Sequence, residues 1–414
     1  MLQEIMPGTE EQLQKEMTTA YIGFDPTADS LHIGSLVPIL LLLHFQKAGH
    51  KPIALIGGAT GMVGDPSGKS EERNLLNEQQ LKDNITGINR QLRKYLDFDS
   101  GRPNTAEMAN NYDWFKDLSF IHFLRDVGKH ITVNYMMSKE SVRKRIEGDT
   151  GISYTEFAYQ LMQGYDFYWL FTNKNCKMQM GGSDQWGNIT TGTELIRRKD
   201  GNEAFAFTCP LITKADGGKF GKTEKGNIWL DPEKTSPYQF YQFWLNASDA
   251  DAEKWIRIFT FLPKPEIELL LLKHAADPGA RILQKKLAQQ VTEFIHGREE
   301  FEKAVETTSK LFANQSAPIE SLSIEDLESL DGVVKFDFNV NRLNAEIDIV
   351  SFLAETGIFP SKGEARKMVQ SGGLSVNRNK VSEVGLKLNK EFLLHNKYLL
   401  VQKGKKNYYL IKVQ

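Results

Sequence analysis

The stretch "MTTAYIGFDPTADSLHIGSLVPILLLLHFQKAGHKPIALIGG", residues 17–58, decides the fold. It predicts a strand over 17–25, a helix over 32–49 and a nearly continuous apolar strand over 51–58, with Pro38 in early helical turns where a missing N–H matters least. Strand, helix and strand with a glycine-rich exit make a βαβ unit. The unit indicates an α/β, doubly wound (Rossmann-like) parallel sheet, in which ligands bind at the carboxyl ends of the strands.

Later segments extend this pattern and suggest the domain organisation. Residues 177–182 and 204–212 are further candidate strands, and residues 237–311 have the pattern of amphipathic helices. Residues 313–332 are rich in small polar residues and predict a boundary. We therefore predict an α/β domain, a glycine-rich loop with an α-helical domain, a linker and a small basic α+β domain, over residues 1–215, 216–315, 316–345 and 346–414 respectively.

The bulk composition is that of an ordinary globular protein, with 414 residues, 40% hydrophobic and 25% charged. The longest apolar run, residues 36–43, is much shorter than the roughly 20 residues of a membrane span, and the polar N-terminus has no apolar signal region. Cys176 and Cys209 lack metal-ligand spacing. We expect a cytoplasmic protein with reduced thiols, no membrane association and no tightly bound metal.

The net charge of −2 hides an asymmetry. Residues 351–414 carry 12 Lys/Arg and 4 Asp/Glu, a balance of +8, so the rest of the chain carries −10. Within this tail, Arg366 and Lys367 fall on a predicted short helix, and Arg378 and Lys380 follow a glycine turn. Such clustered cations suit an RNA backbone. A lysine-rich solubilising surface is the alternative.

Two glycine-rich strand exits carry candidate ligand-binding carboxylates. "GGATGMVGDPSGKS", residues 57–70, lacks P-loop spacing because Val63 stands where the first glycine is needed, but Asp65 remains and could face an ammonium group. In "GGSDQWGN", residues 181–188, the glycines admit a ligand to the backbone and Asp184 could hold a ribose diol. A turn aspartate and a tight turn are the respective alternatives.

A helix face and a loop complete the set of motifs. Tyr159, Gln163 and Asp166 are spaced four and three apart, so they share a helix face that suits a small polar ligand, unless it is simply exposed. "PLITKADGGKFGKT", residues 210–223, is glycine-rich, and we expect it to be mobile. Its lysines could close on phosphates, a solvated hairpin being the alternative.

Taken together and in this order, the motifs resemble one family. "YIGFDPTADSLHIG", "GDPSG", "NNYDW", "VGKHITVNYMM", "GGSDQWGN" and "KFGKT" are similar to segments of bacterial tyrosyl-tRNA synthetases, which are class I aminoacyl-tRNA synthetases, and the resemblance covers nearly the whole chain. It implies a ligase that joins tyrosine to ATP, with magnesium, to give tyrosyl-adenylate and pyrophosphate, and then passes the tyrosyl group to tyrosine tRNA. It also implies a homodimer with residues 127–137 at the interface, and an RNA-binding tail.

The resemblance further implies a role for each matching residue. Tyrosine would be bound by Tyr21, Asp65, Asn111, Tyr159, Gln163 and Asp166, with Tyr21 and Asp166 on the phenol hydroxyl, Asn111 at the edge of the pocket and the other three on the ammonium. ATP would be bound by Gly23, Asp25, His32, Ser35, Gly182, Asp184 and Lys222. The catalytic set would be Thr27, His32, Gln185, Lys219, Lys222 and Thr223, with Gln185 near the carboxylate and the others on the pyrophosphate. Arg366, Lys367, Arg378 and Lys380 would contact tRNA.

Two features depart from the family pattern. The family signature ends in histidine where this chain has Ser35, a shorter hydrogen-bond donor, but the other signature residues are intact, so we predict a working site. The first strand begins near Thr18, without the family's usual tryptophan-bearing helix ahead of it, so an abbreviated start is expected.

Two other functions remain as alternatives. One is another adenylate-forming enzyme of the superfamily, including tryptophanyl-tRNA synthetase, although indole offers no hydroxyl group to Asp166. The other is an RNA-binding protein with a catalytically silent synthetase fold.

Overall fold

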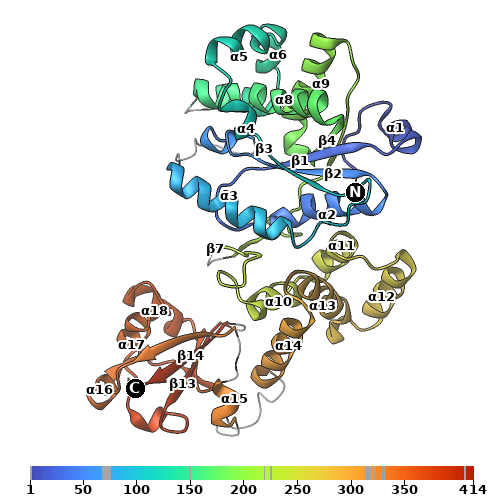
Figure 1. Ribbon diagram of the computed structural model, residues 1–414. Helices are drawn as coiled ribbons and strands as arrows, with labels where there is room; N and C mark the ends of the chain where they lie inside the picture. The colour runs from blue at the N-terminus through green and yellow to red at the C-terminus, as the bar shows by residue number, and fades with distance from the viewer. Residues whose placement is uncertain are drawn as a thin grey trace. The chain divides into compact units, whose positions relative to one another are not determined.

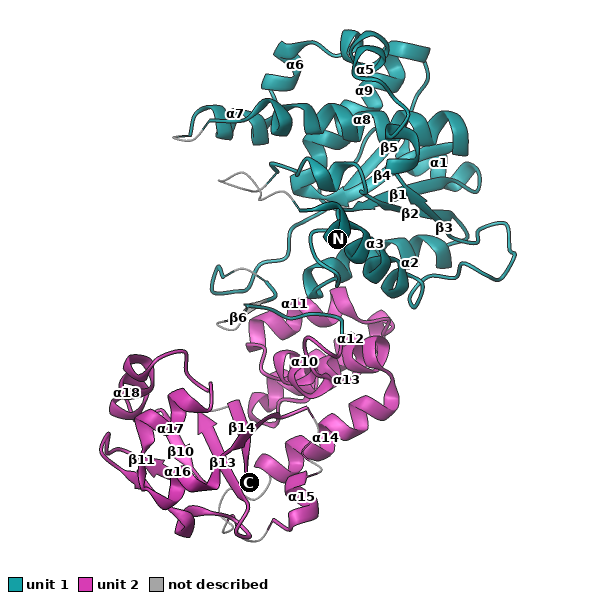
Figure 2. Cartoon of the chain, turned by 60° about the vertical axis from the view of Figure 1, so that its left-hand side comes forward, with its two compact units in different colours: residues 1–231 teal, residues 232–414 magenta. Residues whose placement is uncertain are grey.

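The computed structural model describes the chain in ten segments (Figure 1). The described residues are 2–67, 76–148, 151–218, 220–223, 226–312, 319, 322–328, 330, 332–404 and 407–414. They form two compact units, residues 1–231 and 232–414 (Figure 2).

The first unit is built on a five-stranded parallel sheet of order β3-β2-β1-β4-β5. Its strands are β1 Thr19–Phe24, β2 Lys51–Ile56, β3 Glu107–Asn110, β4 Cys176–Gly182 and β5 Phe205–Cys209. The four strands expected from the sequence are confirmed. The edge strand β3 was not predicted, because all four of its residues are partly exposed and it has no apolar run.

Helices cover both faces of the sheet, which confirms the doubly wound fold. Figure 1 shows α2 (Leu36–Lys47) and α3 (Glu78–Leu92) on one face, and α8 (Tyr154–Lys174) and α9 (Trp186–Asp200) on the other. The helix predicted over 32–49 begins later, because residues Ile33–Ser35 form a 3₁₀ turn.

A short helix, α1 (Thr9–Lys15), precedes β1. Ahead of it, Gln3 N donates to the Thr208 carbonyl and Met6 N to the Ala206 carbonyl, so the N-terminal segment covers the outer edge of β5. An edge strand covered in this way has no free row of N–H and C=O groups along the paired stretch.

Four short helices lie between β3 and β4: α4 Tyr112–Phe115, α5 Phe120–Asp126, α6 Val133–Met137 and α7 Glu140–Ile146. A buried ion pair joins α7 to α8, with Arg145 Nη1 and Nη2 donating to the two Glu156 oxygens at 2.6 and 2.8 Å. This insert also presents exposed apolar side chains: Phe120, Ile121, Leu124, Val133 and Met137.

The second unit begins with helices, as predicted. They are α10 Pro237–Leu245, α11 Asp249–Phe259, α12 Lys264–Ala276, α13 Ile282–His296 and α14 Arg298–Phe312. Trp244, Trp255 and Phe240 are fully buried among them and form aromatic contacts that hold α10 against α11.

The rest of the second unit is a small α+β module. Its sheet has the order β11-β10-β13-β14-β8, with β8 Val334–Phe338, β10 Leu374–Val376, β11 Asn379–Val381, β13 Tyr398–Lys403 and β14 Asn407–Val413. A two-stranded sheet pairs β9 Ile347–Asp348 with β12 Lys387–Leu388. The helices are α15 Ile324–Glu328, α16 Val340–Asn344, α17 Ile349–Glu355 and α18 Lys362–Gln370.

Two boundaries differ from those expected. Strand β8 pairs in parallel with β14, so part of the predicted linker 316–345 supplies an edge of the C-terminal sheet. Residues 216–231 belong to the first unit, because Leu230 N donates to the Leu31 carbonyl. Half of the predicted boundary segment 313–332, namely residues 313–318, 320, 321, 329 and 331, lies outside the described residues. Among the residues that are described, no helix has the length and apolar character needed to cross a membrane.

Candidate active site

The carboxyl ends of β1, β2 and β4 form the place where a ligand is expected. The chain crosses from β1 to β2 on one side, whereas β4 lies on the other side of β1, so the winding of the sheet changes direction between β1 and β4. Such a switch point leaves a crevice outside the strand ends. Each of these strand ends carries residues singled out in the sequence.

Asp166 on α8 lies at the centre of a buried cluster of polar side chains. Asn111 Nδ2 donates to its Oδ2 at 3.0 Å, and Trp114 Nε1 donates to its Oδ1 at 2.9 Å. Tyr21 on β1 is fully buried, and its hydroxyl has no hydrogen-bond partner in the described part of the chain. An unpartnered buried hydroxyl costs free energy, so a ligand that hydrogen-bonds to it is favoured.

The electrostatics of this buried cluster suit a ligand hydroxyl group. Burial raises the pKa of Asp166 to about 8, although the hydrogen bonds from Asn111 and Trp114 act to lower it. Burial also raises the pKa of Tyr21 well above its usual range, and the nearby charge of Asp166 adds to this effect. The cluster therefore offers a neutral phenol and a carboxyl group whose pKa is about 8.

A chain of hydrogen bonds runs from the Asp166 cluster to Asp25, the residue that follows β1. Asn111 Nδ2 donates to Thr60 Oγ1 at 3.0 Å, and Thr60 Oγ1 donates to Asp25 Oδ1 at 2.9 Å. Tyr159 donates its hydroxyl proton to Asp25 Oδ2 at 2.9 Å, which leaves the Tyr159 oxygen as an acceptor. A Cβ at Gly57 would lie 2.2 Å from Asp25 Oδ1, so only glycine leaves room for this chain.

A second polar cluster gathers Asp65, Gln163, Gln185 and Asn188. Gln185 Nε2 donates to Asp65 Oδ2 at 2.8 Å, and Asn188 Nδ2 donates to Gln163 Oε1 at 3.0 Å. The charge of Asp65 helps to raise the pKa of Tyr159, after the larger effects of burial and of Asp25. The cluster is rich in acceptor oxygens and lies close to Tyr159, as a site for an ammonium group requires.

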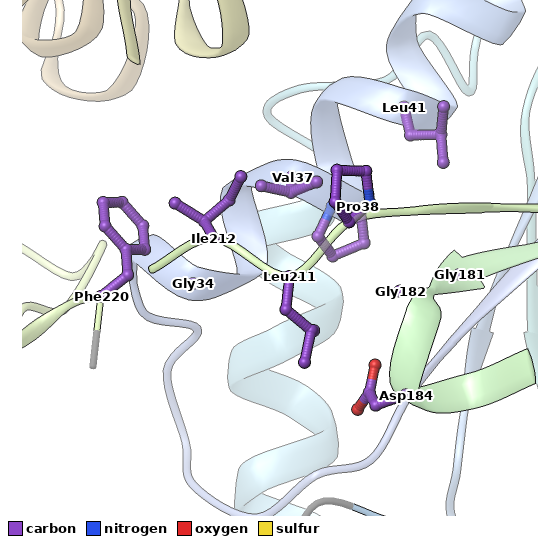
Figure 3. A pocket seen from close by; sticks show the side chains of 11 residues that line it. Gly34, Val37, Pro38, Leu41, Gly181, Gly182, Asp184, Leu211, Ile212 and Phe220 are labelled. Carbon is purple, nitrogen blue, oxygen red and sulfur yellow. The ribbon is translucent and has the colours of Figure 1, made fainter. Parts of the chain in front are cut away.

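Asp184 stands at one end of a pocket of about 280 Å³. Figure 3 shows it apart from the apolar side chains of Ile212 and Phe220, which lie toward the other end. Burial raises the pKa of Asp184. The pocket is lined by Gly34, Val37, Pro38, Leu41, Gly181, Gly182, Asp184, Pro210, Leu211, Ile212 and Phe220. A flat apolar group with a polar end fits such a lining.

The signature segment is the stretch 25–35 between β1 and α2. It carries His32 directly before the 3₁₀ turn Ile33–Ser35. Gly34 N donates to His32 Nδ1 at 3.0 Å, so a neutral His32 carries its proton on Nε2 and can act there as a donor. Ser35 is half-buried at the N-terminal end of α2, while Thr27 and Gly23 are exposed at the end of β1 and beyond it.

The chain that follows the glycine-rich segment 210–223, called here the lysine loop, returns to this signature segment. Strands β6 (Lys222–Thr223) and β7 (Gly226–Asn227) form a small antiparallel hairpin, for whose first strand only the backbone is described, and Lys219 lies outside the described residues. Beyond the hairpin, Ile33 N donates to the Ile228 carbonyl at 2.9 Å. The loop therefore starts and ends next to the segment that carries His32.

Comparisons with known proteins identify the family. The model "tRNA synthetases class I (W and Y)" matches residues 13–313, and "Tyrosine--tRNA ligase SYY-like C-terminal domain" matches residues 329–411. The chain is 60% identical to the tyrosine–tRNA ligase of Porphyromonas gingivalis, over 100% of this chain and 97% of that one. It is 59% identical to that of Flavobacterium johnsoniae, over 99% and 96%. The chain belongs to the tyrosine–tRNA ligase family.

A solved structure agrees with this assignment to the tyrosine–tRNA ligases. The C-terminally truncated mitochondrial tyrosyl-tRNA synthetase of Aspergillus nidulans superposes with a TM-score of 0.66 at 30% identity, covering 75% of this chain and 91% of that chain. The resemblance inferred from the motifs is thereby confirmed, and so is the class I synthetase fold.

Two of the tRNA residues expected for a tyrosine–tRNA ligase lie on α18, and two lie on the β10–β11 hairpin. Arg366, Lys367 and Lys380 are exposed. Arg378 is half-buried and donates through Nη2 to the Lys310 carbonyl at 3.3 Å, at the C-terminal end of α14. Its guanidinium therefore contacts the helical part of the second unit.

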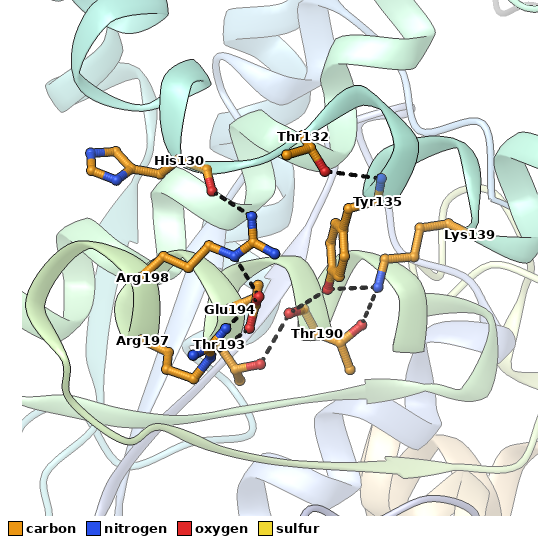
Figure 4. A network of polar contacts seen from close by, with 9 residues as sticks. All are labelled: His130, Thr132, Tyr135, Lys139, Thr190, Thr193, Glu194, Arg197 and Arg198. Carbon is orange, nitrogen blue, oxygen red and sulfur yellow. Dashed lines mark hydrogen bonds and ion pairs between the residues drawn. The ribbon is translucent and has the colours of Figure 1, made fainter.

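The segment 127–137, expected at a dimer interface, is tied to α9 by a polar network (Figure 4). Lys139 Nζ donates to the Tyr135 hydroxyl at 2.7 Å and to Thr190 Oγ1 at 2.9 Å. Arg198 donates to the His130 carbonyl at 3.0 Å and to Glu194, whose pKa is lowered to about 2, chiefly by its hydrogen bond from Arg197. The same helix carries Asn188 at the candidate site.

Sequence reasoning missed three residues of the site. Trp114 and Thr60 lie inside motifs that were quoted, but indole and hydroxyl groups in those motifs gave no sign of which acceptor they would reach. Asn188 follows Asp184 by four residues, and it occupies the same helical face as Gln185 within one turn. That spacing was the only available signal.

Proposed function

We propose the following reaction for this tyrosine–tRNA ligase. The carboxylate of tyrosine attacks the α-phosphate of ATP, which forms tyrosyl-adenylate and releases pyrophosphate. The tyrosyl group then passes to a hydroxyl at the 3′ end of tyrosine tRNA. This chemistry needs placement and charge stabilisation more than covalent help from the protein, which agrees with a site built from glycines, amides and carboxylates.

The buried hydroxyl of Tyr21 beside Asp166 is the observation that carries the choice of tyrosine as substrate. In our proposal the substrate phenol donates to the Asp166 carboxylate and accepts from Tyr21. Asn111 and Trp114 hold Asp166 in place for this contact. Phenylalanine would leave these buried polar groups unpaired, which is costly.

The substrate ammonium would be received by Asp65, Tyr159 and Gln163. Support comes from the acceptor role of Tyr159, whose proton is already given to Asp25. Gln185 Nε2 now donates to Asp65, at the position that the ammonium would take. Once displaced, Gln185 would be free to turn toward the substrate carboxylate.

ATP would lie in the pocket that Asp184 closes at one end. The adenine would take the apolar end near Phe220, and the ribose diol would bind Asp184. Gly23 and Gly182 would let the nucleotide approach the strand ends. Asp25 would contribute through its backbone, because its carboxylate already accepts from Thr60 and Tyr159.

The pyrophosphate would be stabilised by groups around the signature segment. The proposed groups are Thr27, His32, Ser35, Lys219, Lys222 and Thr223, with magnesium accompanying ATP. The Nε2 proton of His32, set by the Gly34 contact, supports a donor role toward phosphate oxygens. Lysines act at such sites as point charges that a loop brings into place.

The partners follow from the surfaces of each unit. We propose that Arg366, Lys367, Arg378 and Lys380 contact tyrosine tRNA in the cytoplasm. We also propose a homodimer, with the segment 127–137 and its neighbours at the interface. The exposed apolar side chains of the insert, among them Phe120, Ile121 and Val133, support this, because a patch of this kind is costly in contact with water.

A pyrophosphate-exchange assay tests the activation step. The protein is incubated with ATP, labelled pyrophosphate and tyrosine, tryptophan or phenylalanine in separate reactions. We expect exchange with tyrosine alone. Exchange with tryptophan would assign a different substrate, and no exchange with any amino acid would contradict the proposed enzyme activity.

A further inference from the structure

Helix α3 forms hydrogen bonds to the signature segment through two buried amide side chains. Asn84 Nδ2 donates to the Pro26 carbonyl at 2.9 Å. Seven residues further along the same helix, Gln91 Oε1 accepts from Leu31 N at 2.7 Å and Gln91 Nε2 donates to Ser30 Oγ at 2.9 Å. Both side chains are buried, and a spacing of seven places them on one helix face.

The helix also approaches the segment more closely than a side chain would permit. A Cβ at Gly87 would lie 2.0 Å from the Asp29 carbonyl oxygen. Glycine is therefore required midway between Asn84 and Gln91, and the backbone of α3 packs directly on the segment. Three independent contacts over residues 26–31 show that α3 is built to hold this segment.

The opposite side of the same segment is held by the chain that leaves the lysine hairpin. The Leu31 carbonyl accepts from Leu230 N at 2.9 Å, and Ile33 N donates to the Ile228 carbonyl at 2.9 Å. The N–H group of Leu31 is thus satisfied by Gln91, and its carbonyl accepts both from Leu230 N and from the Ser30 hydroxyl at 2.9 Å. The ring of Trp229, between these two anchor points, meets His32 edge-on at 6.2 Å between centroids.

We propose that Gln91 is a positioning residue for adenylate formation. Its amide fixes the position of the Leu31 backbone and so places the imidazole of His32, the next residue. It also fixes the Leu31 carbonyl, to which the chain after the hairpin β6–β7 is bound through Leu230 N. Gln91 itself touches neither substrate. The inference rests on the proposed function only in its kinetic part, because the position of His32 can be measured without turnover.

The test variant is Gln91→Met, which keeps the length of the side chain and removes both hydrogen bonds. Its matched control is Gln46→Met on α2. Gln46 is a buried glutamine that also makes paired backbone contacts, donating to the Asp97 carbonyl at 2.8 Å and accepting from Asp97 N at 3.0 Å. It holds a different loop, so both variants lose comparable contacts but only one loosens the signature segment.

We expect Gln91→Met to lower the rate constant of adenylate formation by roughly 10- to 100-fold, the scale of effect that a small misplacement of a catalytic group produces. The KM for tyrosine should stay within about twofold, because the residues proposed to bind tyrosine lie on β1, on α8 and in the segments after β2 and β3, and none lies on α3. Gln46→Met should keep the unmutated rate constant. Equal rate constants for the two variants would overturn the proposal.

A second measurement is independent of activity. Imidazole resonances of protein labelled with ¹⁵N-histidine, with His32 assigned from a His32→Gln variant, should shift for His32 in Gln91→Met and stay unchanged in Gln46→Met. An unshifted His32 signal would overturn the proposal, even if the unmutated protein showed no exchange with tyrosine, a result that would contradict the proposed function alone.

Ser30→Ala serves if Gln91→Met does not fold. It removes the partner of Gln91 Nε2, together with the hydroxyl that donates to the Leu31 carbonyl, and keeps the hydrogen bond from Leu31 N to Gln91 Oε1. We expect a smaller fall in the rate constant, roughly 3- to 10-fold, with the His32 resonance shifted in the same direction. An unchanged rate constant together with an unshifted resonance would count against the role of Gln91.

Discussion

A single hydroxyl group in the first unit explains the preference for a substrate that carries one of its own. Tyr21 lies on a buried strand, where a phenyl ring without the hydroxyl could make the same edge-on contact with Phe167. Its hydroxyl is therefore a cost to the ligand-free protein, and that cost is recovered when a phenol binds. At the scale of one residue, we expect the Tyr21 hydroxyl to lower the stability of the ligand-free protein and to raise the specificity for a phenol.

Tyr21→Phe should therefore have opposite effects on stability and on specificity. We expect the ligand-free protein to unfold at the same or a higher free energy, by up to about 1 kcal/mol, because an unpartnered buried hydroxyl is removed. The preference for tyrosine over phenylalanine in pyrophosphate exchange should fall by about tenfold.

Tyr238→Phe is the matched control for this prediction. The Tyr238 hydroxyl is also buried without a hydrogen-bond partner among the described residues, but it lies on α10 in the second unit. It should give a similar stability change and no change in amino-acid preference. A loss of preference in the control, or none in Tyr21→Phe, would refute the role of Tyr21.

The raised pKa of Asp166 predicts a pH dependence of tyrosine binding. With a pKa of about 8, the carboxyl group is mostly protonated at mildly acidic pH, whereas the substrate phenol needs the carboxylate as acceptor. Tyrosine affinity should rise by roughly 50-fold between about pH 6 and 8, measured by equilibrium dialysis, because the ionised fraction of Asp166 rises from about 1% to about 50%. Asp166→Asn should bind more weakly and show no such rise, and a flat profile in the unmutated protein would contradict the prediction.

The same shift has a defined sign for the stability of the ligand-free protein. Because the folded pKa of Asp166 lies above its unfolded value of 3.8, this group contributes stability fully below that value. The contribution is lost as the pH rises through about 8. Asp166→Asn should remove this part of the pH dependence of unfolding.

Ser35 should act as a modest contributor to activation. A single hydrogen bond to a charged group contributes about 1.5–3 kcal/mol, so Ser35→Ala should slow adenylate formation by no more than about 10- to 100-fold. His32→Ala should slow it more, because alanine removes the imidazole and with it the Nε2 donor. Pre-steady-state measurement decides, and a rate equal to the unmutated one would show that Ser35 makes no contact with the nucleotide.

At the scale of elements, the hairpin β6–β7 and the signature segment behave as one assembly. The backbone pairing of residues 31–33 with 228–230 joins them, and α3 holds them from the other side. Gly221 is part of this arrangement, because its φ of 79° and a Cβ that would lie 2.9 Å from the Ile33 side chain both require glycine. A loop that is anchored at its base can bring its lysines to the same place in each cycle.

Lys222→Ala should slow adenylate formation while tyrosine binding stays nearly intact. A group that stabilises charge developing on the pyrophosphate contributes to the transition state and little to the ground state. Lys82→Ala, which removes an exposed lysine of α3, is the control for the loss of one positive charge. Stopped-flow kinetics separate the two steps, and a large loss of tyrosine affinity with normal activation would disprove the assignment.

At the scale of the whole molecule, activation and tRNA binding are assigned to different units. The residues proposed to bind tyrosine and ATP all lie in residues 1–231, whereas the basic tail lies in 232–414. The C-terminal sheet includes β8, so a deletion that begins at residue 346 would leave β8 in the shortened chain without its parallel partner β14. The module must therefore be removed from residue 334 onward.

Deletion of residues 334–414 should spare adenylate formation and strongly reduce tRNA charging. The truncated A. nidulans relative supports the expectation that the remaining part folds. The affinity that the tail supplies should fall steeply with salt, as phosphate contacts do, in filter-binding measurements on the full chain. Full charging by the shortened protein at ordinary tRNA concentrations would contradict the proposed division.

The sequence by itself determined the class of fold and the family, and it supplied the set of residues that we propose to face the substrates. The period of the apolar residues in 17–58 predicts strand, helix and strand, and the order of the motifs predicts the family. These are local properties, because helix and strand periods and turn residues are set by neighbours in the chain. The positions of Tyr159, Gln163 and Asp166 on one face of α8 were accessible for the same reason.

Only the tertiary structure decided which groups hold these residues in place. Trp114 on Asp166, Thr60 on Asp25 and Gln91 on Leu31 are contacts between segments 52, 35 and 60 residues apart. The edge strands β3 and β8 likewise depend on neighbours that are distant in sequence. A hydrogen bond has no preferred sequence separation, so the partner of a buried polar group becomes known only when the chain has folded around it.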